Sequence, residues 1–153
     1  MRWLRVFPGM PAQVAEVRRF VSFLLAACPA RDDLVLCASE LAANAVLHTA
    51  SGDGGFFSVE VVRTPECAAR VLVTDAGGST VPVARTPAVG RIEELEAGGL
   101  GLAVVAARAS RWGYSCATPG RTVWAEVCWP APGRPGRAGL RSMASAASAR
   151  YGL

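Results

Sequence analysis

The sequence predicts an α+β fold in which a sheet forms one layer and helices form the other. Two observations support this: short apolar segments occur in pairs joined by turn residues, and segments with helical periodicity separate the pairs. The expected order is β-α-α-β-β-lid-α-β-β. Paired strands in one layer and helices in the other give a two-layer sandwich, with a mixed, mostly antiparallel sheet covered on one face by three helices.

Length and composition are those of a globular protein. The 153 residues, of which 52% are hydrophobic, suit one domain with a substantial core. No apolar run reaches the roughly 18 to 20 residues of a membrane span, and residues 1–8 lack the long apolar region of a signal peptide. Five cysteines without C-x-x-C spacing and a single histidine argue against a zinc site. We therefore expect a cytoplasmic protein with buried, reduced thiols and no membrane association.

The cations exclude several classes of nucleotide enzyme. All 16 are arginines, and the chain contains no lysine. This excludes a Walker A loop, a protein kinase that uses a lysine on its third strand, and Schiff-base chemistry. The net charge of +4 is modest, and a nucleic-acid role would require arginines clustered on a folded surface. We expect no nucleic-acid partner.

The N-terminal part predicts one strand and two helices. Residues 2–7 alternate weakly and end at a Pro-Gly turn, which indicates a strand. Pro11 suits the first turn of a helix that ends near residues 28–29. A second helix is expected from about 32 to 50, with Asp32 or Asp33 as its N-terminal cap and Gly52 at its C-terminal cap.

The second helix carries an unusual combination of side chains. Its two faces are both largely apolar, which is typical of a buried helix. One apolar stripe consists of Leu34, Ala38, Leu41 and Ala45. Glu40 and Asn44 lie four residues apart along the edge of that stripe, and His48 lies one turn further on. A buried carboxylate and amide require partners, which could be other protein groups or a metal ion and a phosphate.

The remainder of the chain predicts two hairpins with a lid and a helix between them. Segments 56–63 and 69–74 form the first hairpin, and segments 112–117 and 122–129 form the second. Residues 79–97 have no firm period, and loops of this length are often lids. Glycines before the apolar helix that follows present free backbone N–H groups, which suit phosphate. The predicted domain is 1–130, followed by a flexible Pro/Gly/Arg-rich tail, 131–153.

Four separated stretches resemble, in order and spacing, the motifs of Bergerat-fold ATPases, the superfamily of gyrase and histidine-kinase ATP domains. The pattern E-x-x-x-N-A-x-x-H at 40–48 resembles the N box, and D-A-G-G at 75–78 resembles the G1 box. The sequence G-L-G-L at 99–102 resembles the G2 box, and R-T-V-W at 121–124 resembles the final adenine-side motif. Taken alone, each stretch has an ordinary structural explanation; together they indicate ATP binding.

The resemblance implies a role for each polar residue of the motifs. Asn44 would coordinate Mg²⁺ that bridges the phosphates, and Glu40 would be the general base. Asp75 would accept a hydrogen bond from the adenine amino group. Thr122 would support Asp75 and a water molecule at the adenine.

The resemblance also implies roles for backbone groups. Gly77 would let the backbone approach the base, and Gly99 and Gly101 would present N–H groups to the phosphates. The same motifs place His48, Leu100 and Leu102 among the residues that bind the nucleotide. The expected cofactors are therefore ATP and Mg²⁺.

Within this superfamily the compact chain is most similar to the anti-sigma-factor serine/threonine kinases. The resemblance implies a kinase that phosphorylates a protein partner, with a sigma factor, an anti-anti-sigma protein or both as partners, and a homodimer. One departure is Ser79, which stands where the usual D-x-G-x-G pattern has its last glycine. This departure keeps open an alternative: a catalytically weak, ATP-dependent switch that sequesters a sigma factor or another regulator.

Overall fold

The computed structural model describes residues 1–65, 67–77, 100–117 and 120–131. The predicted lid, 79–97, and the predicted tail from residue 132 onward lie outside the described residues. Among those described, the elements follow the predicted order. They are β1 (Arg2–Pro8), α1 (Gln13–Leu24), α2 (Arg31–His48), the short 3₁₀ turn η1 (Ala50–Gly52), β2 (Phe56–Thr64), β3 (Ala68–Asp75), α3 (Leu100–Arg108), β4 (Arg111–Ala117) and β5 (Gly120–Cys128).

The described strands form one five-stranded sheet in the order β1-β2-β3-β5-β4. Both predicted hairpins, β2–β3 and β4–β5, are confirmed, and every pairing between the described strands is antiparallel. The expected mixed character is therefore absent from this part of the chain. Strands β3 and β4 run in the same direction, because each is antiparallel to β5. They do not pair with each other, because β5 lies between them.

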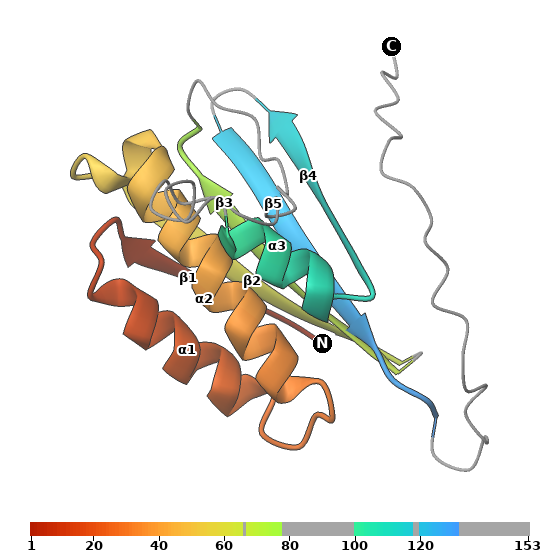
Figure 1. Ribbon diagram of the computed structural model, residues 1–153. Coiled ribbons are helices and arrows are strands. Elements are labelled where there is room, and N and C mark those ends of the chain that lie inside the picture. Colours follow the sequence, from red (N-terminus) through yellow and green to blue (C-terminus); the bar gives the residue numbers. More distant parts are fainter. Residues whose placement is uncertain (66, 78–99, 118–119, 132–153) are drawn as a thin grey trace.

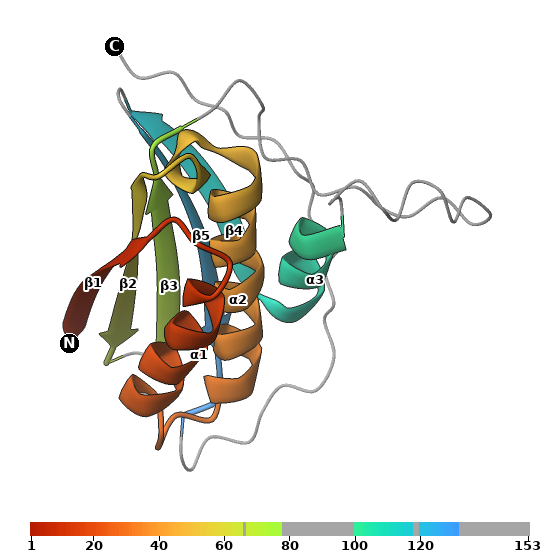
Figure 2. The same cartoon turned by 90° about the vertical axis from the view of Figure 1, so that its left-hand side faces the viewer.

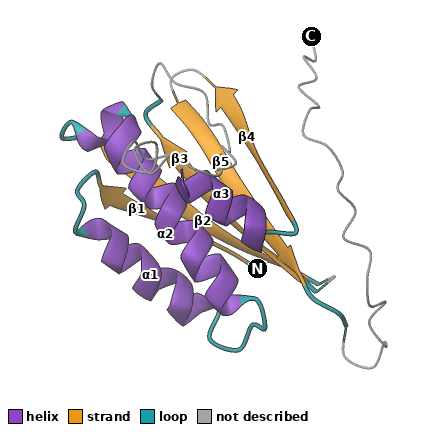
Figure 3. Cartoon of the chain, viewed as in Figure 1, coloured by secondary structure: helices purple, strands orange, loops and turns teal. Residues whose placement is uncertain are grey.

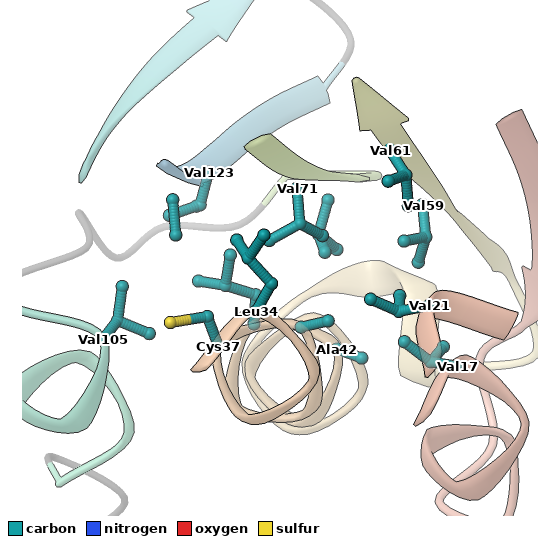
Figure 4. Close-up of a cluster of buried hydrophobic side chains, with 14 of the residues drawn as sticks. Val17, Val21, Leu34, Cys37, Ala42, Val59, Val61, Val71, Val105 and Val123 are labelled. Carbon is teal, nitrogen blue, oxygen red and sulfur yellow. The ribbon is translucent and has the colours of Figure 1, made fainter. Parts of the chain in front are cut away.

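The three helices lie on one face of the sheet, as predicted (Figures 1–3). Helices α1 and α2 cross the sheet directly, while α3 packs against α2 on the side nearer β4 (Figure 2). The predicted stripe of α2 is buried, and so is much of its other face, including Cys37 and Ala42. Figure 4 shows Leu34 and Cys37 of α2 between Val71 and Val123 of the sheet and Val105 of α3. Helix α2 is thus the centre of the core.

The ends of the helices differ from the expectation. Helix α1 is shorter than predicted, since it begins at Gln13 and ends at Leu24. The predicted caps of α2 were wrong: Ala30 occupies its N-cap without a side-chain hydrogen bond, and Asp32 and Asp33 lie inside the first turn. In the first turn their negative charges still interact favourably with the positive end of the helix dipole.

At the other end of α2, Thr49 takes the place expected for Gly52. Its hydroxyl donates to the carbonyl of Ala45 at 2.6 Å and accepts the N–H of Ser51 at 3.2 Å. The threonine therefore satisfies a backbone group at the end of the helix and begins the η1 turn. Gly52 lies within that turn rather than at the helix end.

A buried carboxylate connects three strands on the sheet face opposite the helices. Glu126 of β5 is 3% exposed and lies between Arg70 of β3 and Arg111 of β4. One of its oxygens accepts from Nε and Nη2 of Arg70 at 3.1 and 2.8 Å, and the other accepts from the same two atoms of Arg111. Arg70 also covers the ring of Trp124 at 4.5 Å from its centroid. Paired, bidentate contacts satisfy the carboxylate that burial would otherwise destabilise.

The cysteines are all free thiols, but the expectation that they are buried holds for only part of them. Cys28 and Cys37 are buried, whereas Cys116 and Cys128 are exposed. The exposed pair lies on β4 and β5, where side chains alternate between the covered and open faces. Burial and the neighbouring Asp33 raise the pKa of the Cys37 thiol to about 11. Among the described helices, none is long and apolar enough to span a membrane.

Candidate nucleotide-binding site

Helix α2 carries the predicted N-box side chains along one side. Glu40 and Asn44, one turn apart, are both half-buried, and His48 is exposed in the last turn. The residues around Glu40 are buried, because α2 packs against the sheet, α1 and α3. Glu40 and Asn44 are therefore polar groups at the edge of the core, while His48 faces solvent.

The N-terminal end of α3 lies directly against these two side chains. A Cβ atom added at Gly101, the second residue of α3, would lie 2.9 Å from Oε2 of Glu40 and 3.5 Å from both amide atoms of Asn44. Because Gly101 has no side chain, the backbone of α3 can approach these two side chains this closely. Leu102 anchors this end of the helix in the core, where it is 9% exposed, whereas Leu100 is 40% exposed. The structure thus brings Glu40, Asn44 and the G2 glycine together.

The second group of predicted residues lies at the end of β3. Asp75 is 6% exposed, and its Oδ1 accepts the N–H of Gly77 at 2.7 Å. Gly77 has a φ of 78°, a conformation that L-residues rarely adopt, so its glycine is required by the turn. The neighbouring strand approaches closely, because a Cβ at Gly120 would lie 2.6 Å from the Asp75 carbonyl oxygen.

Arg121, rather than Thr122, contacts the Asp75 carboxylate. The two residues are paired in register across β3 and β5, and Nε and Nη2 of Arg121 lie 3.4 and 3.3 Å from Oδ2 of Asp75. Thr122 is paired with Thr74, with 2.8 Å between their hydroxyl oxygens, on the opposite face of the sheet. The expected support of Asp75 by Thr122 is therefore corrected, because successive side chains of a strand point to opposite faces.

The end of α2 is joined to the end of β3 through the backbone. The N–H of Ala50, in the η1 turn, donates to the carbonyl of Gly77 at 3.1 Å. The helix that carries Glu40 and Asn44 is therefore connected directly to the turn that carries Asp75 and Gly77. The two groups of predicted residues belong to one structural unit.

Comparison with known proteins identifies the family. Residues 7–127, most of the chain, match the histidine kinase-like ATPase domain. The chain belongs to this family. Family membership implies that this chain binds ATP. No match was found among curated proteins.

Solved structures of the same fold agree with this assignment. The RsbU and RsbW domains of Rv1364c from Mycobacterium tuberculosis superpose with a TM-score of 0.62 and 19% identity, over 84% of this chain and 32% of that one. This chain thus spans about a third of that protein. A chain of the SiaB–SiaC complex from Pseudomonas aeruginosa superposes with a TM-score of 0.60 and 16% identity, over 82% of this chain and 88% of that one. These similarities show a shared fold.

The side chains of this ATPase domain offer few ligands for a metal ion. Among the described residues, no group of three or more His, Cys, Asp or Glu side chains could bind one. Mg²⁺ typically takes one or two protein oxygens and completes its coordination with phosphate and water. The half-buried amide of Asn44, which lies close to Gly101, offers one such oxygen.

Two predicted residues fall outside the described structure, and two residues near Asp75 were not predicted. Gly99 and Ser79 lie outside the described residues. Arg121 was missed as a partner of Asp75, although strand alternation with the apolar Val123 indicates that it faces the helices. Ser51 was also missed: it is fully buried and contacts the backbone after Asp75, and a serine in a glycine-rich loop carries no such signal.

Proposed function

We propose that this protein is an ATP-dependent serine/threonine kinase of the anti-sigma-factor type that phosphorylates a regulatory protein partner. The observation that carries the proposal is the meeting of Glu40, Asn44 and Gly101 at one point between α2 and α3. A carboxylate, an amide and the N-terminal end of a helix are the groups that phosphoryl transfer needs: a base, a metal ligand and phosphate-binding N–H groups.

In the proposed reaction each residue has a separate task. The Glu40 carboxylate accepts the proton of the partner's serine or threonine hydroxyl. At the same time, the hydroxyl oxygen forms a bond to the γ-phosphorus of ATP. The bond from that phosphorus to the bridging oxygen breaks, and ADP leaves. Backbone N–H groups near Gly101 bind the phosphates, and the Asp75 carboxylate accepts from the adenine amino group.

We further propose that the Asn44 side-chain oxygen binds Mg²⁺. When bound, this ion neutralises charge on the β- and γ-phosphates. The separation of tasks follows from position, since Glu40 and Asn44 lie one helical turn apart on α2 and both lie close to Gly101.

A protein substrate is supported by the structural relatives. One of them includes an RsbW domain, and the other is a complex of two proteins, SiaB and SiaC. Together with the sequence resemblance to anti-sigma-factor kinases, this favours a sigma factor, an anti-anti-sigma protein or both as partners, and a homodimer as the active form. The partner would present its hydroxyl to Glu40.

One observation favours the alternative of a catalytically weak switch. Both oxygens of Asp75 already have partners, Gly77 for Oδ1 and Arg121 for Oδ2. Adenine must therefore share this carboxylate with two protein donors. In the switch hypothesis, ATP is bound but scarcely hydrolysed, and the bound nucleotide changes the affinity for a sequestered regulator.

The decisive experiment compares the parent protein with Glu40→Gln and Asn44→Ala. ATP binding is measured by calorimetry with and without Mg²⁺, and transfer is measured with radiolabelled ATP and the anti-anti-sigma proteins of the same genome. Glu40→Gln keeps its size but loses the base, so we expect nearly unchanged affinity and transfer reduced by about 10²- to 10⁴-fold. Asn44→Ala should lose the Mg²⁺-dependent part of binding together with transfer.

Glu16→Gln is the matched control, because Glu16 lies on α1 and pairs only with Arg19 among the described residues. It should match the parent in both assays. A parent protein that binds ATP but labels no partner, while ATP still changes partner affinity, would contradict the kinase and support the switch. Absence of ATP binding by the parent would contradict both.

A further inference from the structure

Ser51 is a fully buried polar residue in the turn that follows α2. Its hydroxyl donates to the carbonyl of Phe56 at 2.8 Å and accepts the N–H of Ala76 at 2.9 Å. The side chain therefore connects the start of β2 to the backbone immediately after Asp75. A buried hydroxyl with both a donor and an acceptor contact is a fixed point of the structure.

The segment after Asp75 is fixed at successive backbone groups. Ser51 accepts the N–H of Ala76, Ala50 donates to the carbonyl of Gly77, and the N–H of Gly77 donates to the Asp75 carboxylate at 2.7 Å. Arg121 contacts the other oxygen of this carboxylate, so the orientation of Asp75 depends on Arg121 and on where Gly77 lies. The turn at Ala50 and Ser51 fixes the position of Gly77.

The turn itself has little freedom to move. A Cβ at Gly9 would lie 1.7 Å from the backbone oxygen of Ser51, so the residue that follows β1 packs directly against the turn. On its other side, the hydroxyl of Thr49 accepts the N–H of Ser51 at 3.2 Å. The turn is therefore a rigid support for the Asp75 segment rather than a loose connection.

We propose that Ser51 is a positioning residue for the base-binding end of the ATP site. Its hydroxyl fixes Ala76, and through Gly77 it orients the Asp75 carboxylate toward the adenine amino group. Ser51 does not touch the nucleotide in this arrangement. The inference rests on the proposed function, because it assumes that Asp75 binds adenine.

The test measures discrimination between ATP and purine riboside triphosphate, which is ATP without the 6-amino group. Calorimetry with Mg²⁺ gives both affinities for the parent and for Ser51→Ala. We expect the parent to bind ATP more tightly than the analogue. In Ser51→Ala the ratio of the two affinities should fall about tenfold, which corresponds to the loss of one hydrogen bond. Affinity for the analogue should change little. A merely structural role would weaken both ligands equally and would overturn the proposal.

Ser39→Ala is the matched control. Ser39 is also a buried serine with two hydrogen bonds, but it faces α1, where its hydroxyl accepts from Arg18 Nε at 2.8 Å and donates to the Val35 carbonyl. This variant should keep the parent's preference for ATP. Ser51→Cys, which retains the volume and a weak donor, should show an intermediate preference.

A measurement on the parent protein keeps the proposal testable if Ser51→Ala does not fold. Amide hydrogen exchange followed by NMR should show a protected Ala76 N–H that becomes more protected with ATP. A rapidly exchanging Ala76 amide in the ATP complex would overturn the inference while leaving ATP binding intact. Failure of the parent to bind ATP would instead contradict the proposed function.

Discussion

The guanidinium of Arg121 lies 3.3 Å from the carboxylate of Asp75, and both side chains are buried. The pair connects β3 and β5 at the end of the sheet that carries the proposed base site. Removing one partner of a buried pair leaves an uncompensated charge, which typically costs about 3–5 kcal/mol. We predict that Arg121→Leu lowers the free energy of unfolding by about this amount, measured by urea denaturation.

The control for this prediction is Arg108→Leu. Arg108 of α3 pairs with Asp33 of α2 at a similar distance, 3.4 Å, but both side chains are substantially exposed. Exposed pairs contribute about 0–1 kcal/mol, so this variant should be nearly as stable as the parent. If both variants lost the same free energy of unfolding, the buried Arg121–Asp75 pair would contribute no more stability than an exposed pair.

The fold was predictable because the hydrophobic pattern determines it. The α2 stripe ending at Ala45 is buried, and the alternation in 56–63 and 69–74 matches the paired strands. The ends of α2 were not predictable from local preferences. Asp32 could cap a helix that begins at Asp33, but the helix begins at Arg31 because the preceding turn at Cys28 and Ala30 is packed into the core.

The candidate site was predictable in part. The spacing of Glu40 and Asn44 on one helix places both on one side, but their meeting with Gly101 depends on how α3 packs against α2. The partner of Asp75 depends on strand register: a shift of one residue exchanges Thr122 for Arg121 and moves the side chain to the other face. Sequence motifs define residue types more reliably than they define register.

Acid should destabilise the fold through Glu126. Burial acts to raise the pKa of this carboxyl, but hydrogen bonds from Arg111 and Arg70 outweigh it, so its pKa lies below the ordinary value of 4.5. A lowered pKa in the folded state contributes stability above the unfolded pKa, and that stability is lost as the pH falls through the folded pKa. Urea unfolding followed from about pH 7 downward should show this loss.

Glu126→Gln removes the titrating group and should flatten that pH dependence, at the cost of lower stability near neutral pH. Glu16→Gln is the control, because Glu16 forms an exposed pair with Arg19 on α1. Its pH profile should follow that of the parent. An unchanged acid slope in Glu126→Gln would assign the acid sensitivity to other carboxylates.

The thiols should separate into reactive and protected groups. The thiolate is the form of cysteine that reacts. Cys37 is buried and its pKa is raised to about 11, so little of it is thiolate at neutral pH. Cys116 and Cys128 are exposed. We predict that an alkylating reagent at neutral pH labels the exposed pair in the native protein, and that Cys28 and Cys37 react only after unfolding. Mass spectrometry of the labelled peptides provides the measurement, and rapid native labelling of Cys37 would contradict the described core.

The last prediction separates stability from function at Gly101. A Cβ at this position would lie 2.9 Å from Oε2 of Glu40, which is the end of a flexible side chain and can move away at little cost. Alanine also favours a helix interior by about 0.5–1 kcal/mol over glycine, and the gain is smaller in the first turn, where Gly101 lies. We therefore expect Gly101→Ala to be as stable as the parent or slightly more so in urea denaturation.

Its effect on the site should be the opposite. The added methyl group comes too close to the Glu40 carboxylate and displaces it beside Asn44. ATP affinity should fall by more than about tenfold, comparable to the loss of a hydrogen bond to a charged group, and phosphoryl transfer should fall with it. If displaced Glu40 causes the loss of affinity, Gly101→Ala should weaken ATP binding less in a Glu40→Ala background, where no carboxylate remains to be displaced. A stable Gly101→Ala protein with parental ATP affinity would mean that the nucleotide does not bind beside Glu40, Asn44 and Gly101.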